Sequence, residues 1–286
     1  MLSAARRLSF RPVNVVNRIL PIRLNSTITS THPKLAKDAL LSVSQEKENL
    51  LNSKDYVLFH PVYSKSDLEA ATYTHREVSG IKDRIAFGLV RTMRYVFDTA
   101  TPNVMSERQW LNRICFLETV AGVPGMVAAM LRHTRSLRLL KRDNGWIHTL
   151  LEEAENERMH LLTFMKMKEP GLMFRAMVLV TQGVFFNAYL ACYLLSPQTC
   201  HRFVGYLEES AVHTYTLCLK DIEQGKIRHW GTQPAPEIAR FYWQLSENAT
   251  VKDVVAAVRA DEADHRDTNH ALAELQVDDV NPKAYS

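Results

Sequence analysis

The chain has 286 residues, 46% of them hydrophobic, with only 10 glycines and 11 prolines. This composition is ample for a hydrophobic core, and it favours long helices over an architecture with many turns. The net charge of +4 is local, because residues 1–37 hold basic residues and no acidic residue precedes Asp38. Removal of the arginines in residues 1–25 would leave a net charge of about −1, so the overall basicity gives no support to nucleic-acid binding.

The first 25 residues are rich in arginine, contain serine and lack acidic residues, as mitochondrial transit peptides do. A disordered basic tail would have the same composition, but we expect a transit peptide over residues 1–25. Residues 26–77 are expected to form an irregular N-terminal arm with a helical stretch near 36–51. Residues 78–286 are expected to form one helical domain.

From Gly80 onward the sequence pattern is helical. Apolar residues recur on one face over residues 81–98, and Ser106 is a suitable N-cap for a long helix that runs toward Arg138 and bends at Pro124. No stretch alternates as a strand would, so the predicted fold class is all-α. The further expected helices cover residues 145–170, 172–195, 197–225, 237–247 and 250–275.

Four of the expected helices carry either a lone glutamate among apolar residues or a Glu-x-x-His pair, whose two members share a helical face. Each residue alone would more simply belong to a solvated surface. Together they have the order Glu, Glu-x-x-His, Glu, Glu-x-x-His, which is the ligand set of ferritin-like di-iron and di-manganese bundles. Four carboxylates and two imidazoles suit iron better than zinc, so we predict a ferritin-like four-helix bundle that holds two iron ions. The six candidate ligands are Glu118, Glu157, His160, Glu208, Glu262 and His265.

Three other residues are placed near this site by their spacing. Asn156 and Asp261 each lie four residues before a candidate ligand histidine, and we expect them to support the second ring nitrogens of those histidines, most easily across the bundle. Tyr215 lies seven residues, or two helical turns, beyond Glu208, which places it beside the metals. An ordinary core tyrosine is the alternative interpretation of Tyr215.

The four cysteines have neither zinc-ligand spacing nor redox-pair spacing. We expect all four, Cys115, Cys192, Cys200 and Cys218, to be buried apolar thiols. Cys200 lies at a predicted helix start, where a thiol pKa can be lowered, so it is expected to be the most reactive of the four.

Residues 176–195 form an uncharged run of 20 residues, long enough to span a bilayer. A single span there would place Glu157 and Glu208 on opposite sides of the membrane, where they could not share a metal site. We therefore expect this helix to lie partly in the core and partly at a membrane interface, together with the apolar stripe of residues 81–98 and a set of basic residues. These basic residues are Arg132, Arg135, Arg138, Lys141 and Arg142.

The sequence around the candidate ligands resembles the alternative oxidase family over roughly residues 55–280. The resemblance implies a ubiquinol oxidase of the mitochondrial inner membrane, facing the matrix, that reduces oxygen to water, resists cyanide and pumps no protons. It also implies that the six candidate ligands bind iron, and that the protein is a homodimer lying on one membrane leaflet. The matching motifs are "LETVAGVPGM" (117–126), "LLEEAENERMHLLTF" (150–164), "GYLEESAVHTYT" (205–216) and "RADEADHRDTNH" (259–270).

The same resemblance assigns further roles. Tyr215 would supply an electron or a hydrogen atom during oxygen reduction. The third motif usually carries a glutamate where this chain has Ser210, so the affinity of the pocket is not carried over from relatives. The residues that match the family's quinol pocket are Arg113, Leu117, Leu207, Ala211 and Thr214.

Two other functions fit the same ligand set. One is a di-iron hydroxylase acting on a quinone or a lipid, and the other is a non-catalytic iron-binding helical bundle. Iron storage would favour a cage-forming surface without an apolar access route, whereas this sequence predicts a membrane-facing surface.

Overall fold

The computed structural model describes residues 60, 62–99, 101 and 105–285, and within these ranges it contains helices and no strand. The predicted all-α fold class is confirmed. Two segments that approach near the end of the chain form a single antiparallel bridge, between Pro234 and Thr250. The predicted transit peptide and most of the predicted arm lie outside the described residues.

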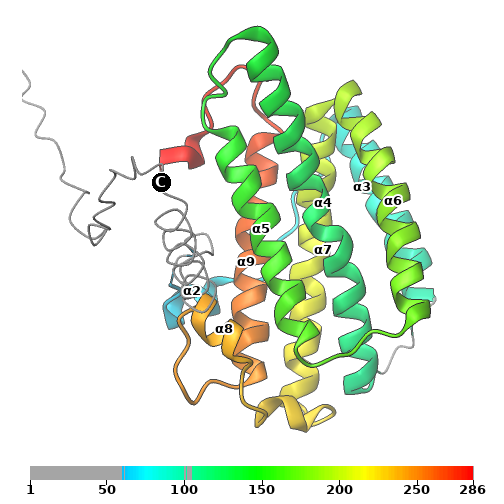
Figure 1. The fold of residues 1–286 in the computed structure, drawn as a ribbon, viewed down its shortest axis with the longest axis vertical. Helices are drawn as coiled ribbons and strands as arrows, with labels where there is room; N and C mark the ends of the chain where they lie inside the picture. Colours follow the sequence, from blue (N-terminus) through cyan, green and yellow to red (C-terminus); the bar gives the residue numbers. More distant parts are fainter. Residues whose placement is uncertain (1–59, 61, 100, 102–104, 286) are drawn as a thin grey trace, which may run out of the picture. The chain divides into compact units, whose positions relative to one another are not determined.

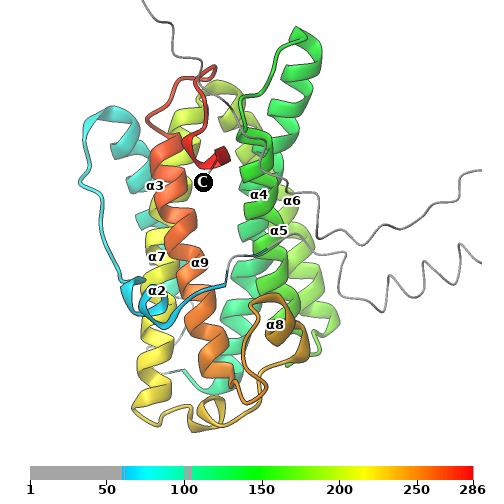
Figure 2. The same ribbon diagram turned by 90° about the vertical axis from the view of Figure 1, so that its left-hand side faces the viewer.

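Four long helices form the bundle: α4 (Glu107–Leu139), α5 (Trp146–Met165), α7 (Pro197–Glu223) and α9 (Val251–Leu272). Helix α4 packs along α5, and α7 packs along α9. In Figure 1, α5 and α9 lie at one edge of the bundle and α4 and α7 lie in its middle. Figure 2 separates the α4–α5 pair from the α7–α9 pair. Four segments far apart in sequence thus surround one core.

Two more helices cover the other side of α4 and α7. Helix α3 (Gly80–Thr99) packs on α7, and α6 (Leu172–Leu195) packs on α4. Both lie at the edge opposite α5 and α9 (Figure 1). The remaining elements are short: α2 (Lys65–Ala70), η2 (Arg228–Gly231), α8 (Glu237–Tyr242) and η3 (Pro282–Tyr285).

Local sequence signals explain where several helices begin. Ser106 caps α4 in a reciprocal capping box with Gln109, and Thr250 caps α9 in the same way with Asp253. Pro197 occupies the first turn of α7, where its missing N–H costs nothing. The predicted bounds of α6 match the structure, whereas α8 ends at Tyr242, before the predicted end.

Small residues bring α4 and α5 close together at the level of the candidate ligands. A Cβ atom at Gly125 would lie 2.7 Å from the Leu150 carbonyl oxygen, and one at Gly122 would lie 3.3 Å from the Ala154 carbonyl oxygen. A side chain at Gly125 would therefore push the helices apart. This close approach brings Glu118 of α4 near the ligands of α5.

The described part of the predicted arm is attached to α9. Arg259 Nη2 donates to the Leu68 carbonyl oxygen at 2.8 Å, and Arg266 Nη1 donates to the Thr72 carbonyl oxygen at 2.9 Å. Residues 65–70, expected to be irregular, form the one-and-a-half-turn helix α2, capped by Ser64. The arm therefore runs along α9, the helix that carries Glu262 and His265.

Arg132 differs from its expected place on a basic membrane-facing surface. Its side chain is buried, Nε donates to Asp143 Oδ1 at 2.7 Å, and its guanidinium lies 4.0 Å from the ring centre of Trp146. A carboxylate partner and an aromatic ring compensate for the burial of the charge. The prediction for Arg132 was wrong because the spacing of basic residues does not reveal such partners.

The cysteines also differ from the prediction. Cys115, Cys200 and Cys218 are buried, whereas Cys192 is exposed on α6, and none of the four forms a disulfide. Burial raises the pKa of the Cys200 thiol to about 12, which outweighs its place at a helix start. The expected reactivity of Cys200 and the expected burial of Cys192 were therefore both wrong.

Candidate metal centre

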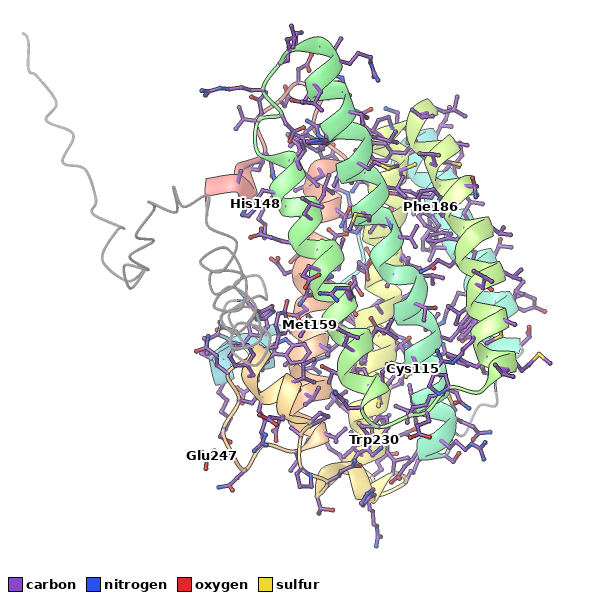
Figure 3. All side chains as sticks on the ribbon, viewed as in Figure 1. Cys115, His148, Met159, Phe186, Trp230 and Glu247 are labelled. Carbon is purple, nitrogen blue, oxygen red and sulfur yellow. The ribbon has the colours of Figure 1, made fainter. Side chains whose placement is uncertain are left out.

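The six candidate ligands meet in the middle of the bundle, although they lie on four helices. Glu118 comes from α4 and Glu208 from α7, while α5 and α9 each supply one Glu-x-x-His pair. Each of the six residues is at most 7% exposed. Met159 and Cys115, labelled in Figure 3, mark this level of the bundle, since Met159 precedes His160 and Cys115 lies one turn before Glu118.

The two histidines point their Nδ1 atoms at the carboxylates. His160 Nδ1 lies 3.4 Å from Glu118 Oε2, 3.4 Å from Glu157 Oε2 and 3.5 Å from Glu262 Oε1. His265 Nδ1 lies 2.8 Å from Glu157 Oε1 and 3.9 Å from Glu262 Oε2. One atom from each of Glu118, Glu157, His160 and Glu262 lies within 4.8 Å of the others. Glu157 is therefore near both histidines.

The atoms that face this cluster lie close to one another but make no well-directed hydrogen bond to the described residues. Buried polar atoms in proteins nearly always have hydrogen bonds, so a group of this size without them is suited to binding a cation. Carboxylates with imidazoles are a ligand set that iron accepts. The residues present therefore fit a metal centre. The unpaired atoms are Glu118 Oε2, Glu157 Oε1, Glu157 Oε2, His160 Nδ1, Glu262 Oε2 and His265 Nδ1.

The charges of the cluster also indicate a need for cations. Burial, followed by the repulsion of Glu262 and Glu157, raises the pKa of Glu208 well above its usual range. Burial likewise raises the pKa of Glu118 to about 8. Burial opposes the ionisation of Glu157 too, but His160 and His265 overcome it and lower the pKa of this carboxyl. Four buried carboxylates thus compete for the positive charge of two imidazoles, and metal ions would supply more.

Asp261 holds the far side of His160. Its Oδ2 atom lies 2.9 Å from His160 Nε2, and four more side chains donate to the same carboxylate. Burial alone would raise the pKa of Asp261, but its hydrogen bonds with His160 and His60 keep it ionised. The bond to Nε2 leaves Nδ1 of His160 free for a metal. The other contacts of Asp261 are with Trp243 Nε1 at 2.8 Å, Asn156 Nδ2 at 3.0 Å, His60 Nε2 at 2.8 Å and Tyr63 OH at 2.6 Å.

Asn156 takes a different place from the one that its spacing suggested. It donates to Asp261 and to the Tyr242 hydroxyl at 3.0 Å, and so supports Asp261 rather than a ligand histidine. Near His265 the structure instead places Glu153, which accepts a hydrogen bond from Asn269 Nδ2 at 2.8 Å. Burial raises the pKa of Glu153 to about 7. Its position one turn before Glu157 was the available signal, and sequence reasoning missed it.

Tyr215 lies beside the cluster with 3% of its surface exposed. Its hydroxyl donates to Glu118 Oε1, and its ring lies 6.5 Å from the ring of Phe164. Burial, followed by the negative charge of Glu118, raises the pKa of Tyr215 well above its usual value. The phenol therefore keeps its proton next to a candidate ligand.

A cavity of about 1460 Å³ opens onto this centre. Glu118, Glu208, Glu262 and Tyr215 are among the residues that line it. Most of the remaining wall is apolar, which suits a large apolar ligand with a few polar groups. All five residues of the expected quinol pocket line it: Arg113, Leu117, Leu207, Ala211 and Thr214.

Arg113 is held rigidly in the cavity wall. Nη1 donates to Thr101 Oγ1 at 3.0 Å and Nη2 to Asp98 Oδ1 at 2.7 Å. Ser210 also lines the cavity, and its hydroxyl donates to the Tyr206 carbonyl oxygen within α7 at 3.3 Å. Ser210 therefore contributes a small, uncharged side chain to the cavity wall.

The chain is similar to proteins of one family. A family model described as "Alternative oxidase" matches residues 63–274. The mitochondrial alternative oxidase of Emericella nidulans is 57% identical over 240 residues, which cover 79% of this chain and 68% of the relative. That of Ajellomyces capsulatus is 52% identical over 244 residues, 79% of this chain and 68% of the relative. That of Yarrowia lipolytica is 43% identical over 273 residues, 91% of this chain and 77% of the relative.

Proposed function

This chain belongs to the alternative oxidase family, and we propose that its six buried ligands hold two iron ions beside a cavity in which ubiquinol is oxidised. The protein is an oxidoreductase, a terminal oxidase that passes electrons from ubiquinol to oxygen and resists cyanide, as its family does. The observation that carries the proposed site is the set of buried ligand atoms without hydrogen bonds, together with the cavity that Glu118 and Glu262 of this set line.

The iron ions, when bound, supply the one-electron chemistry with oxygen that side chains lack. The side chains of the protein orient the proposed iron ligands and supply hydrogen for the reduction of oxygen. Asp261 fixes the ring of His160, and Glu118 accepts the hydrogen bond of Tyr215. Two quinols give four electrons and four protons, which convert one oxygen molecule to two waters. We infer that Tyr215 gives one hydrogen atom to the reduction of oxygen and recovers it from quinol, since its hydroxyl donates to Glu118 and the residue lines the cavity.

Arg113 is the group that we assign to the quinol ring. Asp98 and Thr101 occupy its two terminal nitrogens, while its Nε atom is buried without a hydrogen-bond partner in the described chain. Thr214 accepts a hydrogen bond from Arg94 at 2.7 Å, which fixes the wall between Arg113 and Tyr215. A quinol oxygen at Nε would lie in the same cavity as the Tyr215 hydroxyl.

A membrane surface is the proposed source of the quinol. Helices α4 and α6 are long and apolar enough to cross a bilayer, but half of the apolar window of α4 is buried in the protein, against 11% for α6. On α6 only Tyr189 and Tyr193 are buried, so its share of the core is small. The exposed apolar residues of α3 and α6 include Ile81, Leu89, Val96, Leu172, Leu179, Val180, Val184 and Leu195.

We propose that this apolar face lies on the matrix leaflet of the mitochondrial inner membrane. The relatives are named as mitochondrial proteins, and residues 1–25 have the composition of a transit peptide. A crossing by α6 conflicts with the packing, since α5 and α9, which lie before and after α6 in the chain, carry residues of one cluster. We also propose that the protein is a homodimer, as its resemblance to the family implies.

Epitope tags test this topology. A tag in the loop at residues 140–144 and a tag at the C-terminus are both expected to face the matrix, because α6, which lies between them in the chain, does not cross the membrane. In mitoplasts, both should resist added protease until detergent is present. Digestion of one tag and protection of the other would show that α6 crosses the bilayer.

Oxygen uptake by the purified protein tests the function itself. With a short-tail ubiquinol and cyanide present, we expect two quinols to be consumed for each oxygen molecule, with no oxygen atom incorporated into the quinone. A hydroxylase would add one oxygen atom, visible as a 16 Da gain by mass spectrometry. A non-catalytic iron-binding bundle would consume no quinol.

A further inference from the structure

Three phenylalanines form a row in the wall of the cavity. Phe97 of α3 stacks on Phe116 of α4 with ring centres 5.9 Å apart, and Phe116 meets Phe174 of α6 edge-on at 6.4 Å. All three line the cavity. Stacked and edge-on rings bind a further flat ring well, so this row is a surface for a quinol ring.

A cation lies at each end of the row. The Arg113 guanidinium lies 4.7 Å from the centre of the Phe97 ring, and the Lys168 ammonium lies 3.4 Å from the centre of the Phe174 ring. Arg113 Nε and Lys168 Nζ share a second property: both are buried and lack a hydrogen-bond partner in the described chain. The proposed function uses Arg113 and gives Lys168 no role.

The two cations lie on different rings of the row. Two centre-to-centre steps, of 5.9 and 6.4 Å, separate the Phe97 and Phe174 rings on which they lie. Near the Arg113 end, Arg94 donates a hydrogen bond to Thr214, the residue that precedes Tyr215. The Lys168 end adjoins Leu172 and Met173, which are more than 80% exposed at the start of the apolar helix α6. The Lys168 end therefore lies beside the exposed start of α6, which belongs to the proposed membrane surface.

We propose that the cavity has a second position for a quinol ring, over Phe116 and Phe174, with the Lys168 ammonium donating to a methoxy oxygen of the ring. This proposal rests on the proposed function. Methoxy oxygens only accept hydrogen bonds, and an ammonium only donates them. The ring hydroxyls remain free to donate until the quinol reaches Tyr215.

A waiting position suits the stoichiometry of the reaction. Each oxygen molecule consumes two quinols, and a cavity of about 1460 Å³ has room for more than one ring. A second quinol held at the membrane end reaches the metal centre without a new encounter from the bilayer. Burial lowers the pKa of Lys168, in agreement with the buried position of its Nζ atom.

Equilibrium binding of oxidised quinones tests the second position without turnover. The full chain, loaded with iron in detergent, is titrated with a short-tail ubiquinone while quenching of tryptophan emission is recorded. We expect two binding events per chain. In Lys168→Met, which keeps the length of the side chain, the second event should weaken at least about tenfold, as the loss of a hydrogen bond to a charged donor does.

Two further variants and one analogue separate the hydrogen bond from packing. Lys168→Arg, which keeps a donor, should retain both events, and so should Lys166→Met, since Lys166 is exposed two residues away. Duroquinone, which has methyl groups in place of the methoxy groups, should show a weak second event that Lys168→Met does not weaken further. The analogue therefore reports on the methoxy contact itself.

The outcomes distinguish this proposal from the proposed function. A single binding event in the unaltered protein, or two unchanged events in Lys168→Met, would overturn the second position and leave the oxidase function standing. Equal losses in Lys168→Arg and Lys168→Met would overturn the role of Lys168 as a donor. The absence of any quinone binding by the unaltered protein would contradict the proposed function.

Discussion

Replacing Glu157 by alanine is expected to remove most of the bound iron and to abolish cyanide-resistant quinol oxidation. Glu157 lies close to both histidines, with Oε2 3.4 Å from His160 Nδ1 and Oε1 2.8 Å from His265 Nδ1. Its loss removes a ligand that both Glu-x-x-His pairs share. We expect turnover to fall by more than about 100-fold, since even residues that only support a metal ligand typically account for 10–100-fold.

The measurement combines iron analysis with oxygen uptake on the same preparation. Glu152→Ala is the matched control, because Glu152 lies on the same helix and pairs with the exposed His148 at 2.9 Å, away from the cluster. It should keep both iron and activity. His265→Ala should reproduce the loss seen in Glu157→Ala. Full iron content and full turnover in either of the two ligand variants would refute the di-iron assignment.

The helices and the six candidate ligands could be proposed from the sequence because both depend on local spacing. A Glu-x-x-His pair lies on one helical face whatever the helix packs against. Charged residues on otherwise apolar helices need a shared partner, so Glu118 and Glu208 were identified even though each stands alone. The cluster that contains Glu118, Glu157, His160 and Glu262 then follows from the packing of the helices.

Contacts between distant segments could not be predicted in this way. His60 and Tyr63 bond Asp261 across 201 and 198 residues, and no periodicity connects them. The cation at Lys168 became visible only when the fold placed it on Phe174. Arg132 followed the spacing of a basic surface, yet one aromatic ring and one carboxylate were enough to bury it. Such pairings depend on tertiary structure.

Tyr215→Phe is expected to separate iron binding from catalysis. The substitution keeps the ring that packs 6.5 Å from Phe164 and removes only the hydroxyl, which donates to Glu118 Oε1. No candidate ligand is lost, so the iron content should stay near that of the unaltered protein. Turnover should fall by about 100-fold or more, within the 10²–10⁴-fold range that a positioned proton donor typically contributes.

Tyr206→Phe is the control for this variant, because Tyr206 lies on the same helix α7 and is equally buried, at 1% against 3% for Tyr215. The Tyr206 hydroxyl has no hydrogen-bond partner in the described chain, so its removal should leave turnover within about twofold, as most changes without a lost interaction do. Iron content and oxygen uptake are measured for both variants. If Tyr215→Phe kept its turnover, or if both variants lost it equally, Tyr215 would be a packing residue. A selective loss in Tyr215→Phe with iron retained would show that the O–H bond beside Glu118 takes part in oxygen reduction.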